Sequence, residues 1–234
     1  GISNIGTESV IITDTTVSDA STLITLNSNT TGVITASSVT AVTGTASELN
    51  KLLTAGNDIT QFSENSFSSL TTATVSDSTL SVADLNGAIN ATTSTVFSLS
   101  AGATINTGDQ VAFTTLLGYE NAGQVVISDQ NITVDSGELS VSNAILLNDT
   151  TTGTVTATIS SSSVDTLKTL TGTNAYTITI ASGDATGSTA AEFNTINAAT
   201  SLAVNASAVT GLASDTAVSY THLRAHETSL HLVC

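Results

Sequence analysis

The stretch 29–50 constrains the fold of this chain most, because weaker copies of it recur along the rest of the sequence. Its segments 33–36 and 39–42 are uncharged, alternating and rich in β-branched residues, as short buried strands are. Thr45 then lies three residues before Glu48, the spacing of a capping box, in which two side chains bind backbone N–H groups at a helix start. The stretch therefore predicts a strand, a turn and a capped helix.

Copies of these signals divide the chain into repeat units. Three strand ends share a pattern of a hydrophobic residue, Ser or Thr, and Asp: they are Asp14, Asp77 and Asp129, with a looser fourth copy ending at Asp184. Second strand starts lie at 34–36, 97–99, 155–157 and 204–206. The units predicted from them are 8–70, 71–123, 124–174 and a partial unit 175–217, preceded by 1–7, the end of an earlier unit, and followed by the tail 218–234. Spacings of this size mark arrays in which neighbouring units stack.

Helix signals fall between the predicted strands. Helices are expected at 20–27 and 45–55, from Ser81, from a cap at Thr107 and Gln110, around Val141, Ile145 and Leu146, at 164–170, and from the second capping box of Thr189 and Glu192. In the helix after Thr45, Ala46, Leu49 and Leu53 form one apolar stripe. The segment 61–69 is interpreted as an insertion that lengthens the first unit.

Alternating strands and helices imply parallel strands joined by right-handed crossovers. The expected fold is an α/β solenoid, with short parallel strands on one side and short helices on the other. An all-β repeat array or β-solenoid is the alternative, because Thr, Val and Ser favour strands and short helices are marginal without packing.

Composition excludes several classes of function. The 234 residues carry a net charge of −16 with three Lys and Arg together, whereas nucleic-acid binding needs a basic surface. No apolar run is long enough to span a membrane. Charged residues make up only 9% of the chain, so its surface is built mainly from Ser, Thr, Asn and Gly. The chain has neither an initiator Met nor a signal peptide, so we expect a fragment of a longer reading frame.

The residues needed for most catalytic sites are missing before the tail. That part of the sequence has no His, Cys or Arg, and its lysines are Lys51 and Lys168. Nucleophile–His systems are therefore excluded, and no glycine-rich phosphate loop is present. A carboxylate pair could still act on a polysaccharide. Such sites usually add aromatic platforms, however, and the aromatic residues here fall mostly on predicted core stripes. We expect no enzyme and no cofactor.

Two groups of residues are metal candidates. Asp14, Asp77 and Asp129 recur at one place per unit, so their carboxylates could line a calcium ladder. The alternative is that each Asp ends a strand and caps the following turn or helix. In the tail, the residues with zinc-ligand chemistry are His222, His226, His231 and Cys234. The segment 218–234 resembles translated sequencing-adapter read-through at the ends of gene sequences from environmental DNA, so we interpret this zinc-like pattern as an artefact.

The repeats resemble those of very large secreted surface proteins of marine cyanobacteria and related bacteria. The matching pattern, V-x-[IL]-[ST]-D followed by L-N-x-x-T-[TS]-G-x-V-x-A-S and T-G-T-A-x-[DE]-[LV]-N, is carried at 30–32, 36–37, 44–46, 152–153 and 204–210, within 8–213. The resemblance implies a non-catalytic structural or adhesive protein, extracellular or on the cell surface. The implied partners are neighbouring repeats of the chain, cell-surface polysaccharide or other cells.

A second resemblance competes with the first. The run T-A-S-E-L-N-K-L at 45–52 is similar to the T-A-x-E-L-N-x-L-D-G repeats of phage tail-fibre proteins, and it recurs loosely at 189–194. Here it is not followed by Asp-Gly. A tail-fibre segment is therefore the alternative, and it too is structural rather than catalytic.

Overall fold

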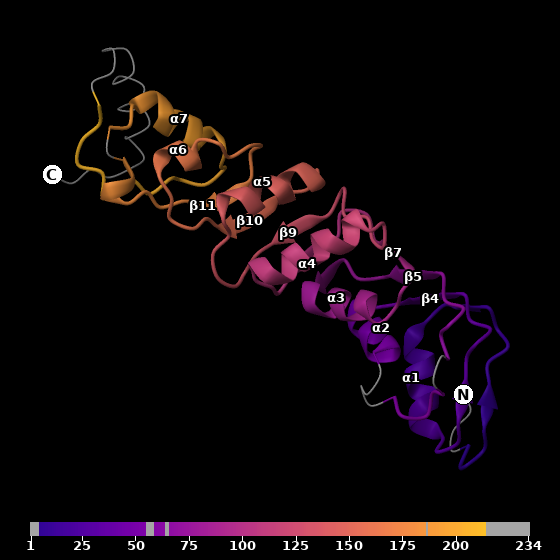
Figure 1. Cartoon of the computed structure of the whole chain (residues 1–234). Coiled ribbons are helices and arrows are strands. Elements are labelled where there is room, and N and C mark those ends of the chain that lie inside the picture. The colour runs from indigo at the N-terminus through magenta and orange to yellow at the C-terminus, as the bar shows by residue number, and fades with distance from the viewer. Residues whose placement is uncertain (1–4, 55–58, 64–65, 186, 214–234) are drawn as a thin grey trace. The chain divides into compact units, whose positions relative to one another are not determined.

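The computed structural model describes residues 5–54, 59–63, 66–185 and 187–213. Strands and helices alternate along these residues (Figure 1), which confirms the predicted α/β class. The chain divides into two compact units, residues 1–133 and residues 134–234, and each is described by itself. No helix in the described ranges has the length and apolar character that a membrane crossing requires.

The first compact unit contains nine strands and four helices among its described residues. Its strands are β1 (Val10–Ile11), β2 (Thr16–Val17), β3 (Ile34–Thr35), β4 (Ala41–Gly44), β5 (Thr72–Val75), β6 (Thr79–Ser81), β7 (Val96–Leu99), β8 (Thr104–Asn106) and β9 (Asn131–Thr133). Its helices are α1 (Ala20–Asn29), α2 (Ala46–Leu53), α3 (Val82–Asn90) and α4 (Gln110–Asn121). The predicted helix at 20–27 is confirmed as α1, which runs on to Asn29, and the helix predicted at 45–55 corresponds to the shorter α2.

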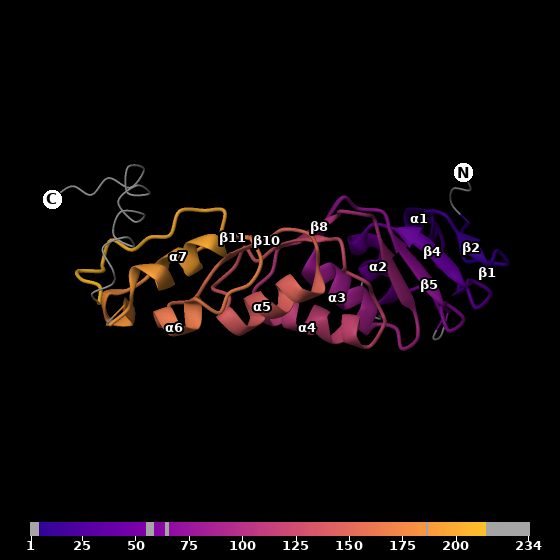
Figure 2. The same ribbon diagram turned by 90° about the horizontal axis from the view of Figure 1, so that it is seen from above.

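All described strand pairs in the first compact unit are parallel, as predicted. Strands β2, β4, β5 and β7 are paired in that order, β6, β8 and β9 form a second row, and β1 pairs with β3. Figure 2 shows β2, β4 and β5 at one end of the row of helices α1 to α3. Each of these pairs joins two strands that are separated in the chain by one helix. That arrangement is the one expected of parallel strands, which need a crossover connection.

The register of the β2-β4-β5-β7 sheet sorts its side chains onto two faces. Equivalent buried positions on these strands line up across the sheet: Val17, Val42, Ala73 and Phe97. On β5 and β7, the alternate positions Thr72, Thr74 and Ser98 are exposed. Because successive residues of a strand point to opposite faces, one face of this sheet is core and the other meets solvent.

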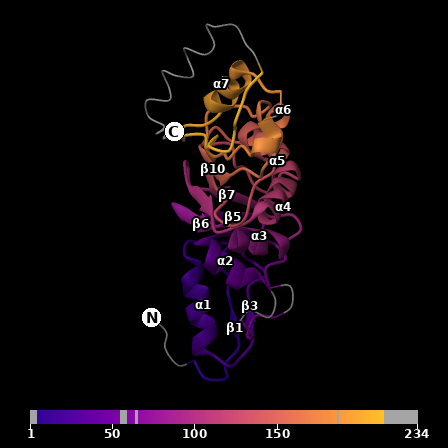
Figure 3. The same ribbon diagram turned by 90° about the vertical axis from the view of Figure 1, so that its left-hand side faces the viewer.

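Helices α1 to α4 contact one another in sequence, and α2 and α3 lie side by side in Figure 3. Helix α2 begins with the predicted capping box. Thr45 Oγ1 accepts from Glu48 N at 3.2 Å, and Thr45 N donates to Glu48 Oε2 at 2.8 Å. Leu52 rather than Leu53 is buried beside Leu49, so the predicted apolar stripe is wrong by one residue at its C-terminal end.

The predicted cap of α4 is wrong. Asp109 is the N-cap, and its Oδ1 accepts from Ala112 N at 2.9 Å. Thr107 instead has a φ of 59°, in the left-handed region, and lies two residues before that cap. A carboxylate is as good an N-cap as a hydroxyl. The helix therefore starts at Gln110, and its residues Phe113 and Leu117 are buried.

The second compact unit repeats the alternation. Its described elements are α5 (Val141–Thr150), β10 (Val155–Thr158), α6 (Val164–Leu167), β11 (Ala175–Thr177), the 3-10 helix η1 (Ser182–Ala185) and α7 (Ala190–Ala198). Strands β10 and β11 are parallel and again separated by one helix. Tyr176 of β11 is fully buried. Its hydroxyl donates to the carbonyl oxygen of Ala144 in α5 at 3.2 Å.

Two details of the predicted helices in this unit differ. In α5, Val141 is buried as expected, but Leu147 is the buried leucine and Leu146 is 46% exposed. Helix α6 ends at Leu167, before the expected Leu170. The second capping box is confirmed at α7, where Thr189 N donates to Glu192 Oε2 at 2.9 Å.

Candidate functional site

The three predicted calcium-candidate carboxylates occupy different environments. Asp77 follows β5, and its Oδ2 accepts from Ala46 N at 2.6 Å, in the first turn of α2. Asp129 Oδ2 accepts from Gly102 N at 3.2 Å. Asp14 is exposed. Asp77 thus binds the first turn of the preceding helix α2, whereas the sequence alternative placed it as a cap of the turn or helix that follows; the N-cap of that following helix, α3, is Ser81.

The structure gathers no metal cluster within the ranges it describes. There, no group of three or more His, Cys, Asp and Glu residues is placed to hold a metal ion. Calcium binding by the recurring Asp residues therefore stays a prediction. The zinc-like residues His222, His226, His231 and Cys234 lie outside the described residues, so their interpretation as an artefact also stays a prediction.

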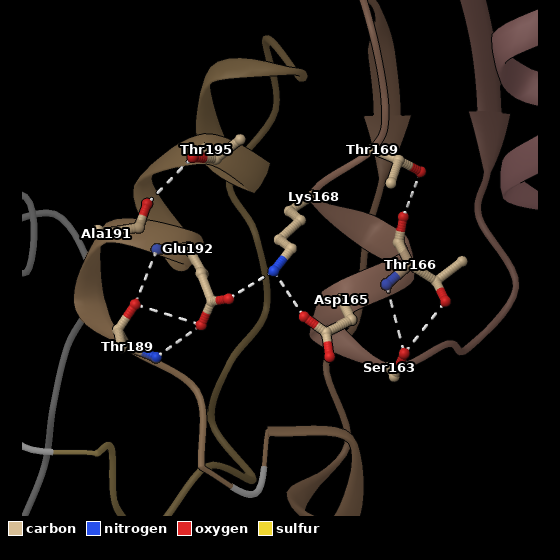
Figure 4. A network of polar contacts seen from close by, with 9 residues as sticks. All are labelled: Ser163, Asp165, Thr166, Lys168, Thr169, Thr189, Ala191, Glu192 and Thr195. Atoms are coloured by element: carbon tan, nitrogen blue, oxygen red, sulfur yellow. Dashed lines mark hydrogen bonds and ion pairs between the residues drawn. The ribbon is translucent and has the colours of Figure 1, made fainter.

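A polar network links α6 to α7 in the second compact unit (Figure 4). Lys168 Nζ lies 2.5 Å from Asp165 Oδ1 and 2.6 Å from Glu192 Oε1. Hydrogen bonds to these two carboxylates raise the pKa of Lys168 to about 12. Its ammonium is therefore protonated at neutral pH and paired. A lysine in this state can tie two helices together, but it is a poor nucleophile or general base.

A cavity of about 660 Å³ lies in the first compact unit, between the end of α2, the described segments 59–63 and 66–70, and the connection 91–95. Its volume is within the range of about 300 to 1,000 Å³ that small-molecule sites occupy. Its lining residues are Leu52, Leu53, Thr54, Ile59, Thr60, Phe62, Ser63, Ser66, Phe67, Ser68, Leu70, Ala91, Thr92, Thr93, Ser94 and Thr95. Each of these described lining residues is either apolar or carries a hydroxyl, and none of those described is charged.

The cavity lies beside two successive helix-to-strand connections that differ in length. The chain from α2 to β5 runs through residues 54–71, whereas the chain from α3 to β7 runs only through residues 91–95. The longer connection pairs with β3 through a bridge between Ile34 and Phe62. The shorter connection forms no β-bridge among its described residues.

The wall formed by the longer connection is held by hydrogen bonds. Ile34 N donates to the Gln61 carbonyl at 2.7 Å, and Ser63 N donates to the Ile34 carbonyl at 2.9 Å. The buried Ser66 hydroxyl donates to the Ser63 carbonyl at 2.7 Å. In the shorter connection, Thr95 Oγ1 donates to the Leu70 carbonyl at 3.0 Å. The cavity therefore has two walls whose backbones are fixed to the sheet or to each other.

Two aromatic rings lie together in this wall. The ring centroids of Phe62 and Phe67 are 5.3 Å apart, with an angle of 34° between the ring planes. Both side chains line the cavity and are half-buried. Tilted rings at this separation make favourable contacts with each other. They form an apolar surface in a lining that also contains aliphatic side chains and hydroxyl groups.

Comparison of the chain with protein-family models, with curated proteins and with solved structures finds no match.

The sequence predictions did not include this cavity. The segment 61–69 was interpreted only as an insertion, and the aromatic residues were assigned mostly to core stripes. One signal could have found it: two of the five Phe residues of the chain fall within that short segment. Insertions in repeat arrays lie on one face of the array and often carry binding functions. The residues that complete the cavity, 91–95, gave no signal of their own.

Proposed function

We propose that this chain is a non-catalytic structural and adhesive segment of a large exported bacterial surface protein, built as an α/β solenoid of stacked repeats. The observation that carries the proposal is the pairing pattern. In each compact unit, every described strand pair is parallel and spans one helix, so each strand stacks on its counterpart from the next strand–helix passage.

Chemistry inside the core supports stacking rather than a single catalytic centre. The buried side chains repeat in rows, such as Val17, Val42 and Ala73, and most of those described are aliphatic. Stability in such arrays is close to a sum over repeats and the interfaces between neighbours. A chain of this kind gains length by adding repeats, which suits a protein that extends from a surface.

The surface chemistry supports exposure to solvent and contact with neutral partners. Exposed positions of β5 and β7 carry Thr and Ser, and the net charge of −16 keeps copies of the chain apart. Such acidity opposes binding of nucleic acids, whose phosphates repel it. We propose cell-surface polysaccharide or other cells as partners, and an extracellular or cell-surface location.

The same properties support a non-catalytic role. Among the described residues, Lys168 is committed to two carboxylates, and Asp77 caps a helix. Neither group is poised for proton transfer, because each already holds a strong partner. We propose no catalytic residue.

A phage tail-fibre segment is the alternative function. One observation favours it: the T-A-x-E-[LF]-N motifs at 45–50 and 189–194 both start helices with a capping box. The two motifs are therefore the same structural device used twice. A fibre, however, requires three chains, whereas a solenoid stacks its repeats within one chain.

A long sequencing read through the parent locus tests the proposal. We expect the frame to continue as many similar repeats beside export genes. The segment 218–234 should then be absent from the natural frame. Neighbouring tail and capsid genes would instead support the fibre, and a continuous frame through His222 into further folded sequence would reopen the zinc-site hypothesis.

A further inference from the structure

We propose that the fifth residue of a helix in this chain selects the helix that can stack beside it, by binding the third residue of that neighbour. This inference deepens the proposed solenoid and rests on it, since it names the residues that decide which repeats can be neighbours. Positions are counted from the first residue of each helix. Three helix pairs show the contact, each within one compact unit: α2 with α3, α3 with α4, and α6 with α7.

Two of these contacts lie in the first compact unit. Asn50, the fifth residue of α2, donates from Nδ2 to Oδ1 of Asp84, the third residue of α3, at 3.0 Å. Asn86, the fifth residue of α3, donates from Nδ2 to the carbonyl oxygen of Ala112, the third residue of α4, at 2.8 Å. Helix α3 thus accepts a hydrogen bond at its third residue and gives one at its fifth.

The contact in the second compact unit uses the same positions with a charged pair. Counted from Val164, the first residue of α6, Lys168 is fifth and directly follows the helix. Its Nζ lies 2.6 Å from Oε1 of Glu192, the third residue of α7 (Figure 4). All three contacts therefore place a nitrogen donor opposite an oxygen acceptor. Their chemistry differs, because an amide meets a carboxylate, an amide meets a backbone carbonyl, and an ammonium meets a carboxylate.

The two positions also fix the offset between neighbouring helices. The fifth residue lies two residues, or about 3 Å, further along its helix axis than the third residue. An asparagine side chain is short, so its amide reaches the third residue of the neighbour at one offset only. A helix that slipped along its neighbour by one turn, about 5.4 Å, would lose the hydrogen bond.

Helix α3 has a second feature that fits Asn50. A Cβ added to Gly87, the sixth residue of α3, would overlap the carboxamide of Asn50. Thr54 Oγ1 donates to Asn50 Oδ1 at 2.9 Å, so the amide oxygen is occupied while the amide nitrogen faces Asp84. The neighbour of α2 is thus recognised by an acceptor at its third residue and by the lack of a side chain at its sixth.

Apolar packing alone discriminates poorly between repeats. The buried rows are mostly aliphatic, and such side chains replace one another at small cost when their total volume is kept. A part-buried polar group that loses its partner, in contrast, pays its desolvation cost without compensation. A wrong fifth or third residue therefore penalises the wrong neighbour, which is how interfaces become specific. In an array of similar repeats, these pairs would set the order of stacking.

Urea unfolding of the full chain tests the proposal at the contact between α2 and α3. Asn50→Asp places a second carboxylate beside Asp84 and should raise the equilibrium constant of unfolding about tenfold. Adding Asp84→Asn restores one amide and one carboxylate with their positions exchanged. The double variant should therefore recover most of the loss. Independent effects of the two substitutions would overturn the proposal.

Ser47→Asp is the matched control, because it adds the same charge at an exposed position of α2. Its effect should be the same with and without Asp84→Asn. Equal coupling of Ser47→Asp and Asn50→Asp to Asp84→Asn would mean general charge repulsion and overturn the proposal.

An uncharged pair of variants covers the case in which Asn50→Asp does not fold. Asn50→Ala and Asp84→Ala each remove one partner, so their combined loss should be smaller than the sum of the single losses. Additive losses would overturn the proposal. Either failure leaves the mass of the chain in solution unchanged, so the pairing of these residues and the solenoid itself are tested separately.

Discussion

Lys168 Nζ lies 2.6 Å from Glu192 Oε1 and so joins the C-terminal end of α6 to the first turn of α7. The other oxygen of the same carboxylate accepts from Thr189 N at 2.9 Å, which completes the capping box of α7. One glutamate thus satisfies a helix N-terminus and a neighbouring cation at once. In a chain with two lysines before its tail, this cation is used to hold successive helices together.

This junction should weaken in acid. The hydrogen bond from Lys168, followed by that from Thr189 N, lowers the pKa of Glu192 below its ordinary value of 4.5. A carboxylate with a lowered pKa stabilises the fold above its unfolded pKa, and this stability is lost as the pH falls through the folded pKa. Glu192→Gln should therefore lower the thermal midpoint at neutral pH, and the difference from the parent chain should vanish below the folded pKa. Melting curves at a series of pH values measure this difference in thermal midpoint. The exposed Glu138→Gln is the control, and an equal pH dependence in that variant would contradict the assignment.

The first capping box offers a second test. Thr45→Ala removes the oxygen that accepts from Glu48 N, and it should lower the free energy of unfolding by about 1 kcal/mol. Thr45→Ser keeps a hydroxyl at the same position and should lose much less. Urea unfolding followed by circular dichroism measures both variants. Equal losses in the two would show that the methyl group, rather than the cap, matters at this site.

Two glycines should respond to alanine in opposite directions. At buried Gly32, an added Cβ would lie 2.1 Å from the Glu8 carbonyl oxygen, a backbone atom that cannot move away freely. Gly32→Ala should therefore destabilise the fold by at least about 2 kcal/mol. At exposed Gly118 in α4, an added Cβ meets nothing within 4 Å, so Gly118→Ala should stabilise by about 0.5 to 1 kcal/mol through helix propensity. Urea unfolding of the two variants gives both signs, and a loss of stability in Gly118→Ala would count against the packing around α4.

The buried hydroxyl of Tyr176 should matter for both stability and alkaline unfolding. Tyr176→Phe removes its hydrogen bond to the Ala144 carbonyl and should cost about 1 kcal/mol. Burial raises the pKa of this phenol to about 12. Because the folded pKa exceeds the ordinary value of 10.0, the stability tied to the neutral phenol is present below pH 10 and is lost as the pH rises towards 12. Unfolding measured on both sides of pH 10 should show a smaller alkaline loss in Tyr176→Phe than in the parent chain. An unchanged alkaline loss would mean that other groups cause it.

Local signals in the sequence predicted the elements well, because those elements depend on nearby residues. The capping boxes at Thr45 and Thr189 and the parallel pairing follow from short patterns. The cap of α4 was wrong because Asp109 and Thr107 are both good caps, and only the backbone conformation at Thr107 separates them. Leu146 and Leu147 are neighbours on a short helix, and the choice between them depends on packing with β10.

The cavity could not be predicted in the same way. It lies beside two connections of different length, 54–71 and 91–95, and its lining side chains meet only after the strands stack. Neither connection contains a motif. Only the pair of Phe residues within 61–69 marked the place in the sequence, and their proximity to 91–95 is a property of the fold.

Light scattering coupled to size-exclusion chromatography tests most directly whether this chain is a solenoid that stacks its repeats within one molecule. A solenoid is expected to give a mass near 23.4 kDa, that of one chain, at all concentrations tested. A phage-fibre segment would require three chains. A mass three times that of the single chain, unchanged on dilution, would contradict the solenoid and favour the fibre.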